Sequence, residues 1–353
     1  MSASLLRVGL VGAGQISHYA AADFAAHPDV RLVATADPSA ERLGELSEKF
    51  QIEARFGSIE DMLAGAELDA IYIATPNVWH APLARLALAH GKHVLLEKPF
   101  ALNETDARSV VDAAARSGRV LSLSMNQRFR ADSQRLRAFV ASGALGDVYH
   151  ARAFWFRRAG IPRLGTWFGK RELAGGGALL DIGVHLLDLA LFTMGNFEPV
   201  SVSGATHASF GARGLGEGGW GRSDVERGAF DVEEFATALI RFANGATLSL
   251  DASWAMHQAE AERHDLVLHG TEGAASCYPA EFYRFGKEPG VYLQSTLEPV
   301  PLEYPHQSPI HNFVEQLRGR EAPCVAIGEA LVVQRVLDAI YESAKLGREI
   351  PLV

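Results

Sequence analysis

The segment 6–17, with the sequence LRVGLVGAGQIS, constrains the fold more than any other part of the chain. Its aliphatic run predicts a buried parallel strand, the letters GAG break that strand, and a helical pattern follows from Ile16 to Phe24. Strand, glycine turn and helix in this order are typical of a dinucleotide-binding fingerprint. Gly12 permits the tight turn, and Gly14 lets a pyrophosphate approach the N–H groups at the helix N-terminus. Ser17 stands at the third glycine position, where a small residue still permits close helix–strand packing.

An acidic residue directly follows the next apolar run and is a second indication that this turn binds a dinucleotide. Asp37 follows the segment 30–36 and lies 20 residues beyond Ser17. A carboxylate there can accept hydrogen bonds from ribose hydroxyls and repels a 2′-phosphate, which favours NAD over NADP. Ser39 and Arg42 could help to bind a phosphate, so NADP stays possible. The alternative is an ordinary strand–helix turn in which Asp37 caps the next helix. The predicted contacts of the cofactor with this region are Gly12, Gly14, Gln15, Ile16 and Asp37.

The alternation of short apolar runs with helical patterns predicts an α/β fold with two domains. Strands at 6–11, 30–36, 69–74, 92–96 and 119–124 alternate with helices, which indicates a doubly wound parallel sheet over residues 1–124, a Rossmann domain. Residues 125–353 form the second domain, for substrate binding and oligomerisation. Its strands are expected at 148–158, 200–208, 235–242, 246–255 and 265–269, with a helix at 177–192. This domain is therefore α/β as well, with a large, mainly antiparallel open sheet.

Charge and cysteine content narrow the class of protein. The formal net charge is −9, which gives no support for binding to nucleic acid or to an anionic membrane. The two cysteines, Cys277 and Cys324, have no metal or redox spacing and suit a reducing compartment. No signal peptide or membrane-spanning run is recognisable, so we expect a cytoplasmic protein.

Two clusters follow strands of the first domain, where a nicotinamide cofactor would lie. After the third predicted strand come Thr75, Pro76 and Asn77, and His80 begins the next helix. After the fourth come Glu97 and Lys98. A lysine beside a carboxylate in a partly dry site can donate a proton or a hydrogen bond to a substrate oxygen. The alternatives are a capping or packing role for His80 and a solvated strand-end lysine at 98.

A third cluster lies in the second domain, where GGG at 175–177 precedes a helical segment. Asp181 and His185 are four residues apart and share a helix face, and Asp188 lies on the same side. A histidine that titrates near neutrality is a suitable proton acceptor for the oxidation of an alcohol. Asp181 could bind the substrate or tune His185. The alternative is a helix cap with a core histidine. No metal site is predicted, because the pair lacks a third ligand.

Basic and aromatic residues near these clusters are candidates for substrate contacts. Trp155 and Arg157 lie on a predicted strand, Trp167 precedes the glycine turn, and Arg128 follows the domain boundary. A tryptophan could stack on a sugar face, and arginines would suit a polyol or an acidic sugar. For Trp155, Arg157 and Trp167, a place in the core or in an interface is the favoured alternative.

These motifs together resemble the Gfo/Idh/MocA family, the glucose–fructose oxidoreductase and inositol dehydrogenase group. The matching elements span nearly the whole chain: Gly12-Ala13-Gly14, Asp37, Ala74-Thr75-Pro76-Asn77 with His80, Glu97-Lys98-Pro99, Asn126-Gln127-Arg128-Phe129, Gly176-Gly177 with Asp181, Gly183, His185 and Asp188, and Asn244-Gly245.

The resemblance implies hydride transfer between NAD(P) and a hydroxyl carbon of a sugar, a polyol such as inositol, or a related compound. It implies that Lys98, Asp181 and His185 act at the reacting hydroxyl and also bind the substrate. Thr75, Pro76, Asn77, His80, Glu97, Lys98 and Asn126 would contact the cofactor. It further implies a homodimer or homotetramer formed through the exposed face of the C-terminal sheet.

Two other functions are compatible with the same residues. One is a glycoside hydrolase that keeps NAD bound and oxidises its substrate transiently. The other is a non-catalytic sensor that binds a nucleotide and signals through its oligomer. The combination of Lys98, Asp181 and His185 argues against the sensor, since a sensor needs no proton relay.

Overall fold

The computed structural model describes residues 4–221 and 229–352 and divides the chain into two compact units. Unit 1 holds residues 1–125 and 308–331, and unit 2 holds residues 126–307 and 332–353. The predicted domain boundary at 124/125 lies one residue from this division. The segment 308–331, which the sequence analysis placed in the second domain, packs with unit 1.

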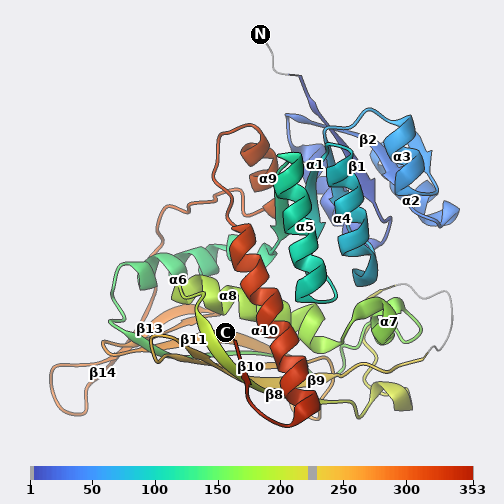
Figure 1. Ribbon diagram of the computed structural model, residues 1–353. Helices are drawn as coiled ribbons and strands as arrows, with labels where there is room; N and C mark the ends of the chain where they lie inside the picture. Colours follow the sequence, from blue (N-terminus) through green and yellow to red (C-terminus); the bar gives the residue numbers. More distant parts are fainter. Residues whose placement is uncertain (1–3, 222–228, 353) are drawn as a thin grey trace. The chain divides into compact units, whose positions relative to one another are not determined.

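Unit 1 is built on a six-stranded sheet whose strand order is β3-β2-β1-β4-β5-β6 (Figure 1). All of its strand pairs are parallel. This is the order of a doubly wound dinucleotide-binding fold, in which the strand order reverses between β1 and β4. The elements are β1 (Leu6–Val11), α1 (Gln15–Ala26), β2 (Val30–Ala36), α2 (Ala40–Phe50), β3 (Ala54–Phe56), α3 (Ile59–Gly65), β4 (Ala70–Ile73), η1 (Asn77–Trp79), α4 (His80–Ala89), β5 (His93–Glu97), α5 (Glu104–Ser117) and β6 (Leu121–Ser124).

Polar caps set the starts of several helices in this unit. Ser39, Ser58 and Asn103 each accept a hydrogen bond from a backbone N–H in the first turn of α2, α3 and α5, respectively.

The strands β4 and β6 are buried along their whole length, as expected for strands covered on both faces. The short strand β3 was not predicted from the sequence, because three residues are too few for a recognisable pattern.

The helix α9 (Pro309–Leu317) explains why a late segment of the chain belongs to unit 1. Its buried side chains Ile310, Phe313 and Val314 join the hydrophobic cluster that contains Leu10 and Phe24. A helix with such an apolar stripe must bury it, and the cluster of unit 1 provides that contact. The sequence alone gave no sign of which sheet the stripe would cover.

Unit 2 is built on a nine-stranded sheet with the order β14-β13-β12-β11-β7-β10-β9-β8-β15. Only the pair of β7 and β10 is parallel, and the other pairs between these strands are antiparallel. The predicted mainly antiparallel sheet is confirmed. The strands are β7 (Val148–Arg157), β8 (Pro199–His207), β9 (Phe235–Phe242), β10 (Thr247–Ser253), β11 (Glu262–Gly270), β12 (Ala274–Cys277), β13 (Ala280–Phe285), β14 (Tyr292–Thr296) and β15 (Ile350–Pro351).

Helices cover one face of this sheet, which we call its inner face (Figure 1). On β7, Ala151 and Ala153 are buried on this face, whereas Arg152 on the other, outer face is exposed. The remaining elements are η2 (Asn126–Phe129), α6 (Ala131–Ala141), η3 (Trp167–Gly169), α7 (Arg171–Ala174), η4 (Leu179–Gly183), α8 (Val184–Met194), η5 (Gly211–Arg213) and α10 (Ile327–Leu346), which begins in unit 1.

The helix predicted at 177–192 begins with a π-turn in the structure. Residues Leu179–Gly183 form η4, a π-helical segment, and α8 continues from it. Such turns are rare and occur frequently at functional sites.

The stretch Arg171–Met194 is long and apolar enough to span a membrane, with a mean hydropathy of 1.6. However, 78% of its most apolar window is buried inside the protein, as expected for a core helix.

Candidate active site

The glycine turn between β1 and α1 has the geometry of a phosphate cradle. Gly12 has φ of +92°, and a Cβ there would lie 2.3 Å from the carbonyl oxygen of Ala74. A Cβ on Gly14 would meet no atom within 4 Å, so the space at the start of α1 is open. Gly12 is therefore required by the backbone, while the open space at Gly14 fits the approach of a ligand phosphate to the helix N-terminus.

Ser17 and Asp37 hold this turn in place. The hydroxyl of Ser17 is buried and donates to the carbonyl oxygen of Gly12 over 2.6 Å. The carboxylate of Asp37 accepts from the backbone N–H groups of Ala13 (2.7 Å) and Ser39 (2.8 Å). Ser17 thus replaces the third glycine with a bond that closes the turn. Asp37 lies at the end of β2, beside the turn, where a ribose acceptor is needed.

His80 joins the two predicted clusters of unit 1. Its ring nitrogens contact the carbonyl oxygens of Pro99 (Nδ1, 2.7 Å) and Thr75 (Nε2, 3.0 Å). Burial lowers the pKa of His80 to about 4, although both carbonyls favour the protonated ring. The Lys98–Pro99 peptide bond is cis. His80 therefore connects the loop after β4 to the turn that carries Lys98.

The carboxylate of Glu97 lies next to Lys98 and is held by hydroxyl groups. Tyr72 donates to its Oε1 over 2.8 Å, and Ser124 also donates to the carboxylate. Burial raises the pKa of Glu97, and these bonds together with the charge of Lys98 offset the rise in part. Asn77 is buried, whereas Thr75, Pro76 and Lys98 are half-buried. The predicted cofactor contacts through these residues remain predictions.

In unit 2, Asp181 lies within the π-turn η4 and His185 at the start of α8. The indole N–H of Trp254 donates to Oδ2 of Asp181 over 2.8 Å. His185 is 9% exposed, and its ring centroid lies 6.5 Å from that of Trp155. The two predicted catalytic residues of this unit are thus on one short helical segment, and each has an aromatic neighbour from the inner face of the sheet.

The start of this segment is held by the buried residue Glu233. Its Oε1 accepts from the N–H groups of Gly177 (2.8 Å) and Leu179 (3.2 Å) and from the hydroxyl of Tyr341 (2.8 Å). Its own carbonyl oxygen accepts from the N–H of Ala178. Three consecutive amides that open the helical segment are therefore bonded to one residue, which is the arrangement that a helix N-terminus requires.

Two glycines are needed for this close approach. A Cβ on Gly177 would lie 1.9 Å from the carbonyl oxygen of Glu233, and a Cβ on Gly176 would lie 1.9 Å from the hydroxyl of Tyr341. The GGG signal in the sequence is therefore explained by the contact with Glu233 and Tyr341. Burial raises the pKa of Glu233, and its bonds to Tyr341 and the amides oppose that rise.

Arg128 and Asp188 form a buried ion pair in unit 2. Nε and Nη2 of Arg128 bind the two carboxylate oxygens of Asp188 over 2.9 and 2.7 Å, and both side chains are almost fully buried. The guanidinium also lies 4.8 Å from the ring centroid of Phe192. This gives Arg128 a structural role that the sequence analysis did not include, and its predicted contact with substrate stays a prediction.

Comparison with known proteins identifies the family. A model of the oxidoreductase family's NAD-binding Rossmann fold matches residues 6–125, and a model of the GFO/IDH/MocA C-terminal domain matches residues 133–276. The chain belongs to the Gfo/Idh/MocA oxidoreductase family. It is therefore an oxidoreductase with an NAD-binding Rossmann domain, as its motifs predicted.

The following relatives match this chain over nearly its whole length. The chain is 30% identical to D-glucoside 3-dehydrogenase of Escherichia coli (strain K12), over 100% of this chain and 99% of that protein. It is 34% identical to a putative UDP-kanosamine synthase oxidoreductase subunit of Amycolatopsis mediterranei (strain S699), over 91% of each. Among solved structures, GenD2 from gentamicin A biosynthesis in complex with NAD has a TM-score of 0.80 at 28% identity, and the match covers 100% of this chain and 98% of GenD2.

The remaining predicted residues of this family member lie in the following places. Asn126 opens η2 in unit 2, and Trp167 opens η3 and stacks on Phe168. Arg157 is half-buried and donates from Nε to Oε1 of Glu262 over 3.1 Å. Partial burial would raise the pKa of Glu262, but the bonds from Trp155 and Arg157 outweigh it and lower the pKa.

Sequence reasoning missed several residues of the site. Trp254 contacts Asp181, and Glu262 contacts Arg157. Glu233 bonds to the amides that open the segment carrying Asp181, and Tyr341 bonds to Glu233. All four residues lie far in the chain from the residues that they contact. One signal was available for Trp254, since it continues the alternation of buried residues Leu248, Leu250 and Ala252 along β10. For Glu233, no pattern in the sequence indicated a contact with residues 177–179.

Proposed function

We propose that this chain oxidises a hydroxyl carbon of a sugar, polyol or related compound with NAD, and that Lys98, Asp181 and His185 act at the reacting hydroxyl. The observation that carries the proposal is the Asp181–His185 segment, with Asp181 fixed by Trp254 and the segment fixed by Glu233. The similarity to D-glucoside 3-dehydrogenase supports the substrate class, since the name of that relative states a sugar derivative as its substrate.

Each of the three residues has a distinct task in this proposal. His185 accepts the hydroxyl proton, because a neutral imidazole is a suitable base near neutral pH. Lys98 donates a hydrogen bond to the same oxygen, and Asp181 accepts one and orients the substrate. When bound, NAD supplies the acceptor for the hydride that leaves the hydroxyl carbon.

The residues of unit 1 fit this cofactor. The open space over Gly14 and the N-terminus of α1 would hold the pyrophosphate, and Asp37 would accept from the ribose hydroxyls. A carboxylate in that place disfavours a 2′-phosphate, so we propose NAD as the preferred form. Exchange of Asp37 for Ser should raise the relative use of NADP.

The experiment is a turnover assay with NAD and a panel of neutral D-glucosides, anhydrosugars and inositols. The proposal predicts that NADH accumulates with at least one of them. Release of the aglycone without NADH accumulation would instead indicate the hydrolase alternative. Tight binding of NAD with no turnover of any carbohydrate would favour the sensor.

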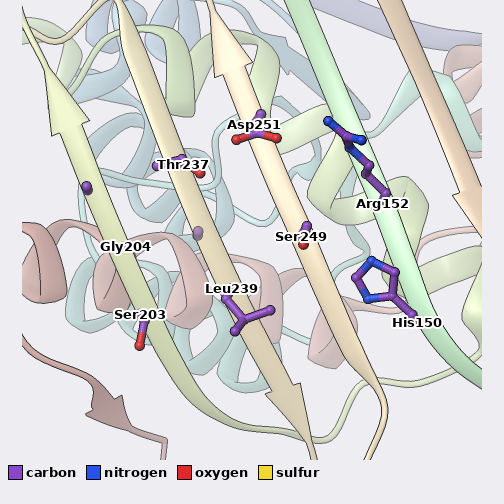
Figure 2. Close-up of a pocket in the computed structure, with 10 residues that line it drawn as sticks. His150, Arg152, Ser203, Gly204, Thr237, Leu239, Ser249 and Asp251 are labelled. Atoms are coloured by element: carbon purple, nitrogen blue, oxygen red, sulfur yellow. The ribbon is translucent and has the colours of Figure 1, made fainter.

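We also propose that the outer face of the sheet in unit 2 forms a homo-oligomer in the cytoplasm. This face carries an open hollow of about 630 Å³ with polar and charged side chains from four strands, among them His150, Arg152, Thr237 and Asp251 (Figure 2). A mixture of both charge signs on one patch suits pairing with a second copy of itself. Light scattering of the wild type and of Arg152→Glu tests this, with a smaller species expected for the variant. Cell fractionation tests the location.

A further inference from the structure

Four side chains extend the inner face of the sheet beyond its helical cover. Trp155 and Arg157 on β7 lie opposite His264 and Glu262 on β11. They share a face with the buried residues Ala153 and Leu266, since side chains alternate along a strand. We call Trp155, Arg157, Glu262 and His264 the β7–β11 wall. Trp155 also neighbours His185, so the wall begins beside a proposed catalytic residue.

Contacts among these side chains fix their orientation. The rings of Trp155 and His264 stack with centroids 5.1 Å apart, and the Arg157 guanidinium lies 5.0 Å from the Trp155 ring centroid. Glu262 accepts from Nε1 of Trp155 and from Nε of Arg157 through one oxygen, Oε1. His264 in turn lies 5.0 Å from the ring of Tyr278. Such mutual support is what a preorganised binding surface needs.

Several polar atoms of the wall have no hydrogen-bond partner within residues 4–221 and 229–352. They are the two terminal nitrogens of Arg157, Oε2 of Glu262 and the ring nitrogens of His264. The side chains of Arg157 and Glu262 are 27% and 46% exposed, and His264 is half-buried, so all three residues are partly accessible. The wall thus offers donors and acceptors side by side, the combination that recognises neighbouring hydroxyl groups.

The charge balance of the wall decides which substrates it suits. An uncompensated arginine favours carboxylates and phosphates. Here the Arg157 charge is paired with Glu262, with Nε and Oε1 3.1 Å apart. An anionic ligand would meet the Glu262 carboxylate as well, whereas neutral hydroxyl groups can bond to both residues.

We propose that the β7–β11 wall is a specificity subsite that binds hydroxyl groups of a neutral glycoside next to the reacting carbon and selects against anionic sugars. The inference rests on the proposed function and adds Glu262 and His264 to the residues that contact substrate. Glu262 is the element that distinguishes neutral from acidic substrates.

The test compares kcat/KM for methyl glucopyranoside and for the corresponding glucuronide, with NAD, in the wild type and in Glu262→Gln. The wild type should prefer the neutral glycoside. Removal of one compensating charge should shift the ratio toward the glucuronide by about tenfold. Arg157→Gln in the same background should reverse that shift, because the uncompensated cation is then gone.

The matched control is Glu260→Gln. Glu260 pairs with Arg263 over 3.1 Å, and Arg263 points to the opposite face of β11, 5.8 Å from the ring of Phe154. This variant frees a nearby arginine outside the wall, so the substrate ratio should not change. An unchanged ratio in Glu262→Gln, or an equal shift in both variants, would overturn the subsite while the proposed function stands.

A second variant gives an independent readout. Arg157→Leu should lower kcat/KM for the neutral glycoside by about tenfold through loss of its donors, with the affinity for NAD unchanged. Unchanged kcat/KM would count against the subsite. A wild type that binds NAD but oxidises no carbohydrate would overturn the proposed function, and the subsite with it.

Discussion

The indole N–H of Trp254 donates to Oδ2 of Asp181 over 2.8 Å and connects the end of β10 to the π-turn. The Trp254 side chain is fully buried, and its backbone N–H bonds to the carbonyl oxygen of Glu234. Asp181 is therefore hydrogen-bonded to a side chain that is itself held in place by the core. This contact places a carboxylate at a defined position beside His185.

The first prediction concerns this contact. Trp254→Phe keeps an aromatic ring but removes the donor, so Asp181 loses this hydrogen bond. We expect kcat to fall by roughly 10- to 100-fold, as for other groups that orient a ligating residue, with the affinity for NAD unchanged. Steady-state kinetics and NAD titration measure both. Trp220→Phe, at an exposed tryptophan, is the control and should retain wild-type kcat.

The second prediction concerns Glu233 as a positioning residue. Glu233→Ala leaves the N–H groups of Gly177 and Leu179 without their acceptor, so kcat should fall while KM for NAD stays the same. Glu233→Gln keeps an acceptor oxygen and should restore most of kcat. Glu234→Ala is the matched control, since the buried Glu234 binds the N–H groups of Ser209 and Phe210 in the same manner. An equal loss of kcat in both alanine variants would contradict a specific role for Glu233.

The third prediction concerns the buried pair of Arg128 and Asp188. Arg128→Met leaves a buried carboxylate without its partner, which should reduce the free energy of unfolding by roughly 3–5 kcal/mol. The double variant Arg128→Met/Asp188→Leu should recover most of this loss, because it removes both charges. Urea denaturation measures both. A single variant as stable as the wild type would refute the structural role.

The fourth prediction is a pH dependence of stability that arises from His80. Its pKa of about 4 in the folded state lies below the value of about 6.5 in an unfolded chain. Between these values the unfolded state binds more protons, so the stabilising contribution is complete above about pH 6.5 and is lost as the pH falls toward 4. The loss amounts to about 3 kcal/mol at most.

The variant His80→Gln should reduce that slope of stability against pH. His90→Gln is the control, because His90 is exposed and bonds only to its own helix in the described residues. Thermal unfolding at several values between pH 4 and 7 measures the slope. Equal slopes in the wild type and in His80→Gln would show that His80 does not carry the dependence.

Local patterns were enough to predict much of the fold. The glycine turn, the parallel sheet of unit 1 and the five strands predicted in unit 2 follow from alternation and turn residues that are close in sequence. Ser17 at a glycine position needed the structure for its explanation, since its bond to Gly12 depends on the path of the turn. The short strand β3 and the strands β12 to β15 lacked a recognisable pattern.

Contacts between residues far apart in the chain limited how much of the candidate site could be predicted from the sequence. Trp254 and Asp181 are 73 residues apart, and Glu233 and Gly177 are 56 residues apart. Neither contact is encoded by spacing, because each depends on which strands are neighbours in the sheet. The helical spacing of Asp181 and His185 predicted that they share a helix face, but the residues that orient the segment became visible only in the folded chain.

The central claim is that His185 is the base for an NAD-dependent oxidation of a carbohydrate hydroxyl. The most direct measurement compares NADH formation by the wild type and by His185→Gln with the best neutral glycoside, alongside the dissociation constant for NAD. The account predicts that the variant binds NAD normally and loses about 10²- to 10⁴-fold in kcat. A variant that oxidises the glycoside at the wild-type rate would contradict it.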